Sequence, residues 1–230
     1  MKTLTHLLFL CLSTSLFGQS LTQQVDEFLK AHVRYGLVDY KAIKANPSEL
    51  NAILNQFNRA PMLKGDDEKA LLINAYNVFV IKGIVDNYPT NGPLEIDGFF
   101  DKQTFRLRGK AVTLNELEKE LLYEQFPDPR LHFALVCAAI GCPKLAAMAY
   151  DGPKLESQLG RQTGAVINNP DFIKLNGPTA QVSEIFKWYA DDFGGADQVI
   201  PFIQKYLLKK VKLSPEYSFY EYDWRLNEQK

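Results

Sequence analysis

Residues 67–87 constrain the fold of this chain more than any other segment, because they are apolar on nearly every side of a helix. Such a helix must be covered from all directions, so we expect a buried central helix. Two amides, Asn74 and Asn77, interrupt the apolar run. An unpartnered buried amide costs roughly 1–3 kcal/mol. We therefore expect both side chains to bond specific groups such as loop backbone, and we favour a structural role over catalysis for both.

Shorter patterns on either side predict further helices and a few short strands. Alternation around a turn at Gly109 predicts a hairpin over 99–112. Thr113 and Glu116 have the spacing of a capping box, so a helix should begin there. The other expected elements are helices over 25–33, 50–57 and 183–189 and strands over 132–137 and 219–224. This mixture indicates an α+β fold, mainly helical, with a small, mostly antiparallel sheet.

The start of the chain predicts a secretory signal peptide over residues 1–20. Lys2 is followed by a short apolar run, and cleavage after Ser20 places small residues at the −3 and −1 positions. Residues 21–230 are long enough for one core, so we expect a single globular domain that is secreted or periplasmic. No later segment is long and apolar enough for a membrane span. The net charge of −1 argues against a nucleic-acid partner, which usually needs a basic face.

After cleavage the chain would keep two cysteines, Cys137 and Cys142. An even pair in an exported protein favours a disulfide, and a turn at Gly141 would bring the two together. Pro143 is well suited to the first position of a helix, which would place Cys142 at the N-cap. The helix dipole would then stabilise a nucleophilic thiolate. Disulfide and nucleophile are both open from the sequence.

His132 is the nearest histidine to these cysteines and would act as the general base for Cys142. Its imidazole would need an orienting group, for which Glu118, Asn74 and Asn77 are the candidates. The alternative for His132 is a core histidine bonded to backbone. We expect no metal site, because the C-x4-C spacing fits structural zinc poorly and no fourth ligand is near. No cofactor is expected, since no glycine-rich phosphate loop occurs.

A set of motifs spread along the chain resembles domain-of-unknown-function family 547, in its bacterial exported branch. The motifs are Ile73-Asn74-Ala75-Tyr76-Asn77, Phe99-Phe100, Leu114-Asn115-Glu116-Leu117-Glu118, His132-Phe133-Ala134-Leu135-Val136-Cys137 with Gly141-Cys142-Pro143, Ile185-Phe186-Lys187-Trp188-Tyr189 with Asp192-Phe193, and Tyr222-Asp223-Trp224-Arg225-Leu226-Asn227. The resemblance implies an exported or envelope protein and no settled activity. It places Glu118, His132 and both cysteines among the matching residues. The family often has a histidine directly after the position of Glu118, and Lys119 stands there in this chain.

Two functions of different classes follow. The first is a thiol-dependent hydrolase or acyl-transfer enzyme acting on amide or peptide bonds, with an unknown peptide or envelope substrate. Its nucleophile would be Cys142, its base His132, and its orienting group Glu118 or Asn74. The second is a non-catalytic envelope binding module with a Cys137–Cys142 disulfide. A redox role is a third alternative, although the spacing differs from C-x2-C and no thioredoxin-like order surrounds it. Substrate and oligomeric state do not follow from the sequence.

Overall fold

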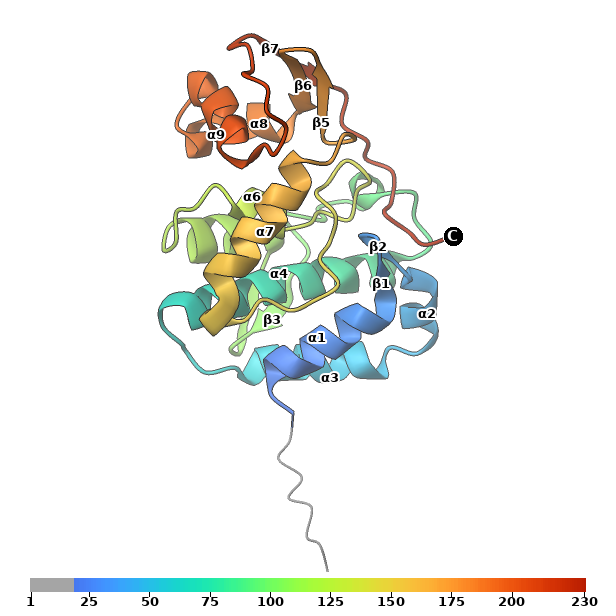
Figure 1. Cartoon of the computed structure of the whole chain (residues 1–230). Helices are drawn as coiled ribbons and strands as arrows, with labels where there is room; N and C mark the ends of the chain where they lie inside the picture. Colours follow the sequence, from blue (N-terminus) through green and yellow to red (C-terminus); the bar gives the residue numbers. More distant parts are fainter. Residues whose placement is uncertain (1–18) are drawn as a thin grey trace, which may run out of the picture.

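A computed structural model describes residues 19–230 (Figure 1). The predicted signal peptide lies outside the described residues except for its last two, Gln19 and Ser20. Ser20 is the N-cap of the first helix, α1 (Leu21–His32), where its side chain accepts a hydrogen bond from the backbone N–H of Gln23. No helix within residues 19–230 is long and apolar enough to cross a membrane.

The segment expected to form a buried central helix does so as α4 (Gly65–Asn87), whose residues are buried on nearly every side from Lys69 to Val85. Helices α1, α2 (Tyr40–Ala45) and α3 (Ser48–Arg59) pack against it. In Figure 1, α1 and α3 lie below α4, and α7 (Leu155–Ile167) crosses in front of it. The apolar stripes of α1 and α3 face this core through residues such as Phe28 and Phe57.

The hairpin and the capping box are both confirmed. Strands β3 (Phe105–Leu107) and β4 (Lys110–Val112) pair antiparallel around Arg108 and Gly109, which both have positive φ. Thr113 then caps α5 (Leu114–Glu116) in a complete capping box with Glu116. The helix continues as a π-helix, η2 (Leu117–Tyr123), which the sequence pattern did not predict. Wider π turns are rare and often lie at functional sites.

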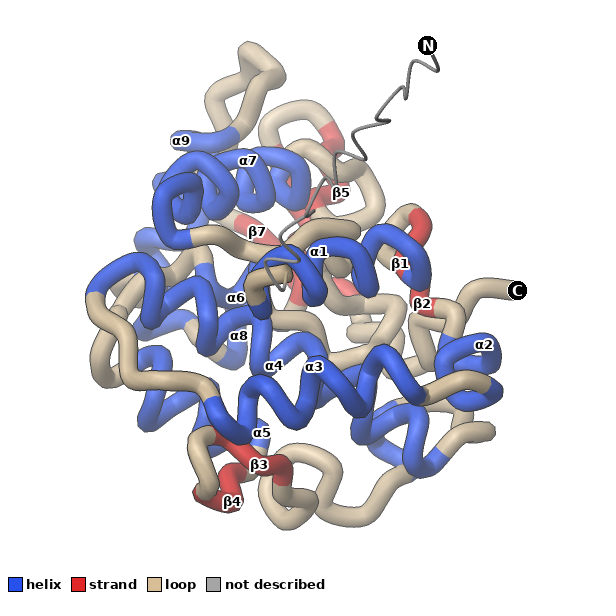
Figure 2. The backbone as a smooth tube through the Cα atoms, turned by 90° about the horizontal axis from the view of Figure 1, so that it is seen from below, coloured by secondary structure: helices blue, strands red, loops and turns tan. Residues whose placement is uncertain are grey.

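The remaining strands are short and scattered among helices, as Figure 2 shows. Strand β6 (Thr179–Ser183) pairs antiparallel with β5 (Ile173–Asn176) and parallel with β7 (Tyr217–Tyr220). Strands β1 (Val33–Arg34) and β2 (Leu37–Val38) form a small ladder. The other helices are η1 (Pro93–Glu95), α6 (Leu131–Ala134), η3 (Gly152–Lys154), α8 (Ile185–Trp188), η4 (Ala190–Phe193), η5 (Ala196–Gln198) and α9 (Val199–Tyr206). The predicted mainly helical α+β class with small, mostly antiparallel sheets is confirmed.

Two local predictions around the cysteines are wrong. The segment expected as a strand from His132 begins as the helical turn α6, and Leu135 is extended only after that turn. No helix follows Pro143, so Cys142 is not a helix N-cap. The loop before Pro143 pairs instead with the C-terminal tail, where the N–H of Ile140 donates to the carbonyl of Arg225 at 2.8 Å. A local sequence pattern carries no information about a partner so far along the chain.

Candidate functional site

A cavity of about 400 Å³ brings together four of the five residues proposed from the sequence. Glu118 reaches it from η2, His132 from α6, and Cys137 and Cys142 from the loop that follows. Most of its other walls are aromatic and apolar, and its lining is completed by Tyr76, Phe100, Asn115, Lys119, Leu135, Ile185, Trp188, Tyr189, Tyr222 and Trp224. Apolar pockets with a few convergent polar groups are the usual form of small-molecule sites.

Asn74, the fifth proposed residue, lies elsewhere. Its side chain donates to the carbonyl of Tyr150 and accepts from the N–H of the same residue, both at 2.8 Å. It lines a separate cavity of about 530 Å³ between α3 and α4. Asn77 bonds the carbonyl of Ala134 at 2.9 Å and the N–H of Val136 at 3.0 Å, which fixes the backbone leaving α6. The prediction that both amides bond loop backbone is confirmed.

Glu118 is a buried carboxyl among phenols. Its residue is 8% exposed, and the groups that hydrogen bond to it are Tyr189 and Tyr76. Burial raises the pKa of Glu118, and the hydrogen bonds from the two tyrosines only partly oppose that rise. No ion pair to Glu118 exists within the described part of the chain. The carboxyl therefore retains its proton to higher pH than an exposed glutamate.

His132 is oriented by a carboxylate that the sequence patterns did not single out. Its Nε2 lies 2.8 Å from Oδ2 of Asp192, in η4. The imidazole stacks on Tyr189 and Tyr123, with ring centroids 3.9 and 4.8 Å away. Burial lowers the pKa of His132 to about 4, and Asp192 opposes that shift without reversing it. At neutral pH the imidazole is therefore neutral, with Nε2–H donating to Asp192.

The two cysteines are adjacent. Their sulfur atoms lie within bonding distance, and the Cα atoms are 6.3 Å apart, inside the range of disulfides. The hydroxyl of Tyr222 lies 3.0 Å from Sγ of Cys142 and 3.2 Å from Sγ of Cys137, and the N–H of Cys137 points to Sγ of Cys142 at 2.9 Å. Cys142 is buried, whereas Cys137 is partly exposed.

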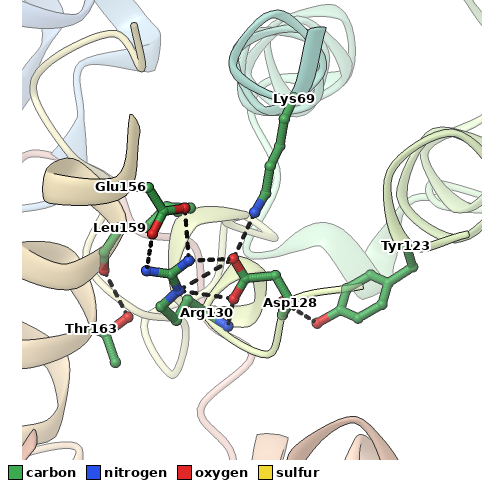
Figure 3. A network of polar contacts seen from close by, with 7 residues as sticks. All are labelled: Lys69, Tyr123, Asp128, Arg130, Glu156, Leu159 and Thr163. Atoms are coloured by element: carbon green, nitrogen blue, oxygen red, sulfur yellow. Dashed lines mark hydrogen bonds and ion pairs between the residues drawn. The ribbon is translucent and has the colours of Figure 1, made fainter. Parts of the chain in front are cut away.

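An ion network next to the cavity holds the ring that supports His132 (Figure 3). Asp128 accepts from Lys69 at 2.6 Å and from Arg130 at 2.7 Å, and Arg130 also reaches Glu156. Burial alone would raise the pKa of Asp128, but the hydrogen bonds from Arg130 and Lys69 bring it down to about 2. The hydroxyl of Tyr123 donates to the backbone carbonyl of Asp128 at 3.0 Å. The network thus fixes the Tyr123 ring beneath the imidazole.

Several residues of the site were missed because they are distant in the sequence. Asp192 and Tyr222 lie 60 and 80 residues from the groups they bond, His132 and Cys142. Only the motif resemblance, which includes both, pointed toward them. Trp188 and Tyr189 look like core residues in the sequence, yet both line the cavity and Trp188 is 44% exposed. Within residues 19–230 no three His, Cys, Asp or Glu side chains cluster as metal ligands would.

Comparison with known proteins gives one match. Residues 61–165 match the family model described as "Protein of unknown function, DUF547". This range contains α4, the π-helix, α6 and both cysteines, but it ends before Asp192 and Tyr222. No curated protein and no solved structure matches the chain.

Proposed function

We propose that the cavity beside Glu118 binds a small, partly apolar molecule in this chain, whose residues 61–165 match the DUF547 family model. The protein is an exported envelope binding module in this proposal, and a Cys137–Cys142 disulfide fixes one wall of the cavity. The observation that carries the proposal is the carboxyl of Glu118, buried at an aromatic-walled cavity without an ion-pair partner.

The buried carboxyl supplies the polar anchor of such a site. Burying a carboxyl group without an ion-pair partner is unfavourable. Apolar side chains would fill a protein core at lower cost. When protonated, Glu118 has one O–H donor and further acceptor capacity, which suits an uncharged hydroxyl, carbonyl or amide. The phenols of Tyr76 and Tyr189 hold it in place. Perturbed acids in a cavity are typical of functional sites.

Aromatic rings supply the apolar part of the site. Trp188, Tyr222 and Trp224 contact one another, with ring centroids between 4.7 and 5.7 Å apart. Such rings offer large, rigid contact area at low conformational-entropy cost. The chain has two tryptophans in all, and both line this cavity. Intrinsic tryptophan fluorescence therefore reports on the site without any label.

Export is supported by the basic and apolar start of the chain and by the paired cysteines. In a bacterial host, the full chain should be recovered outside the cytoplasm and shortened by about 20 residues. Mass spectrometry of the N-terminus checks this expectation. A full-length product retained in the cytoplasm would contradict export while leaving the proposed cavity untouched.

The binding proposal is tested with three small probes: phenol, benzamide and cyclohexanol. We expect saturable changes in tryptophan fluorescence with at least one of them, and matching saturation-transfer NMR signals. Trp188→Ala should weaken that binding in the NMR assay at least severalfold, because the ring forms a cavity wall. Leu208→Ala is the matched control, since Leu208 is 83% exposed and does not line the cavity. Equal binding by the two variants, or no saturable binding, would overturn the proposal.

A second candidate is the thiol-dependent hydrolase or acyl-transfer enzyme, because Cys142 and His132 line the same cavity. Asp192 takes the orienting role assigned to Glu118 or Asn74 from the sequence. Three features argue against this enzyme: no helix begins at Cys142, its sulfur is paired with that of Cys137, and the pKa of His132 is low. Reduced protein that is alkylated at Cys142 by iodoacetamide, and that cleaves amide substrates only before alkylation, would establish this candidate instead.

A further inference from the structure

We infer that the Cys137–Cys142 pair is a thiol–disulfide exchange site, at which a small thiol attacks Sγ of Cys137 and Cys142 leaves as the thiolate. This inference goes beyond the binding proposal and does not depend on which molecule the cavity holds. It rests on three features of the pair: the greater exposure of Cys137, a backbone N–H directed at the sulfur of Cys142 beside a phenol that reaches both sulfurs, and a loop that the C-terminal tail holds.

The two cysteines differ in exposure. Both line the 400 Å³ cavity, from which an incoming thiol would approach, but Cys137 is partly exposed whereas Cys142 is 8% exposed and is followed by the buried Pro143. Exchange requires a thiolate to reach a sulfur atom, so the cysteine with the greater exposure is the one attacked. The cavity walls, including Leu135 and Tyr222, give the thiol an apolar approach.

Hydrogen-bond donors favour Cys142 as the leaving group. The Cys137 N–H points at its sulfur at 2.9 Å, and the Tyr222 hydroxyl lies 3.0 Å from it and 3.2 Å from Sγ of Cys137. Donors of this kind stabilise a thiolate and lower the pKa of the leaving thiol, which makes it leave faster. Burial raises the pKa of Tyr222, so the phenol keeps its proton and remains a donor. Burial of Cys142 works against the thiolate, and the two donors offset that cost.

The loop between the cysteines is held independently of the sulfur bond. Ala138 has a φ of 66°, a left-handed conformation uncommon outside glycine. Its carbonyl accepts from the N–H of Asn227 at 3.0 Å, and the N–H of Gly141 donates to the carbonyl of Asp223 at 2.8 Å. These bonds keep the two sulfurs adjacent after reduction, which makes the exchange reversible.

Cys142 also lines a second cavity of about 400 Å³, whose walls include Ile140, Lys144 and Lys174. Both cysteines line the cavity beside Glu118, so exchange takes place at the wall of the proposed binding site.

The step balances with a thiol as the reductant. A thiolate RS⁻ forms a bond to Sγ of Cys137, the Cys137–Cys142 bond breaks, and its electron pair leaves on Cys142. A second thiolate then attacks the R-bearing sulfur of the mixed disulfide, which releases RSSR and leaves Cys137 as a thiolate. In total, two RSH are oxidised to RSSR, and the protein disulfide is reduced to two thiols.

The test follows reduction of the folded, oxidised full chain by 2-mercaptoethanol through the fluorescence of Trp188 and Trp224, next to the pair. Acid quenching and peptide mass spectrometry locate the mixed disulfide. We expect it on Cys137. Tyr222→Phe keeps the ring but removes the donor, and should slow reduction about tenfold, equivalent to about 1.4 kcal/mol in the barrier. Tyr220→Phe is the matched control, because its hydroxyl bonds the carbonyl of Phe172 instead.

Any of three outcomes would overturn the inference. The first is a mixed disulfide on Cys142, and the second is equal rates of reduction for Tyr222→Phe and Tyr220→Phe. The third is a folded protein whose disulfide is reduced only after guanidinium unfolds it. Circular dichroism establishes that both variants fold. Should Tyr222→Phe fail to fold, the site of attack in the unsubstituted protein still decides the assignment of Cys137 and Cys142.

Discussion

The ion network around Asp128 and the cavity beside Glu118 are neighbouring polar clusters with opposite electrostatics. In the network, Asp128 meets two cations, Lys69 and Arg130, and its pKa falls to about 2. In the cavity, Glu118 has two phenols beside it and no cation at ion-pair distance within residues 19–230, and burial raises its pKa although the charge of Lys119 partly opposes the rise. Removing one partner of a buried ion pair leaves the other charge uncompensated and is strongly destabilising. A buried acid without an ion-pair partner offers no such stabilisation, which agrees with the binding role proposed for Glu118.

The largest expected loss of stability comes from breaking the ion network around Asp128. Asp128→Ala should destabilise the protein by about 3–5 kcal/mol, because it leaves Lys69 buried without a counter-charge. Urea unfolding measures the loss. Asp97→Ala is the control: it breaks the pair with Lys102, in which Asp97 is 90% exposed, and should cost less than about 1 kcal/mol. Similar losses of unfolding free energy in both variants would contradict the expected difference between buried and exposed ion pairs.

The next effect is a pH dependence of stability from His132. Its pKa is about 4 in the folded chain and about 6.5 when unfolded, so the unfolded state binds the proton more tightly. Stability should fall as the pH drops from about 6.5 to about 4, by up to about 3 kcal/mol. His132→Gln should flatten that slope in thermal unfolding, and His32→Gln should leave it. An unchanged slope in His132→Gln would refute the neutral imidazole.

The cysteines give an intermediate effect. Cys137→Ala and Cys142→Ala should each cost about 2 kcal/mol, since each opens the same short disulfide loop. Urea unfolding of oxidised protein measures both, and reduction should bring the parent protein to the level of the variants. If only Cys137→Ala destabilises the protein, Cys142 is a free thiol and the catalytic candidate gains support.

The smallest effect is at Glu118. Glu118→Gln should change stability below pH 4.5 by less than about 1 kcal/mol, because glutamine has the size and the neutral charge of the protonated acid. The folded pKa of Glu118 is raised, so the carboxyl contributes stability that is lost as pH rises above its ordinary value of 4.5. Glu118→Gln should remove this loss of stability at rising pH. Asp128→Asn should instead flatten the decline in stability that we expect as the pH falls from 3.8 to about 2. Equal slopes in parent and Glu118→Gln would contradict a raised pKa.

What the sequence predicts well is local. The apolar run of α4, the capping box at Thr113 and the turn at Gly109 are set by neighbouring residues, and each forms as expected. Asn74 and Asn77 were correctly expected to bond backbone, because a buried amide needs a partner. The candidate site was found in part for the same reason: Cys137, Cys142 and His132 lie close together in the chain.

What the sequence does not predict depends on distant partners. Pro143 follows Cys142 as it would at a helix start, but no helix forms there, and the loop of residues 138–141 before it pairs with the distant C-terminal tail. The π-helix carrying Glu118 has no signature in apolar spacing. Asp192 has no neighbour in sequence that marks it as the partner of His132, because η4 brings it there through tertiary packing.

The tail that holds the cysteine loop also reaches the other end of the chain. Asn227 accepts from the N–H of Val38 and from the hydroxyl of Tyr40, while its own N–H donates to Ala138. A residue synthesised near the end thus joins segments made near the beginning and the middle. Contacts of such sequence separation form late and slow folding. The cavity wall is therefore completed only after residue 227 has left the ribosome, and a chain shortened before that residue would lack a finished site.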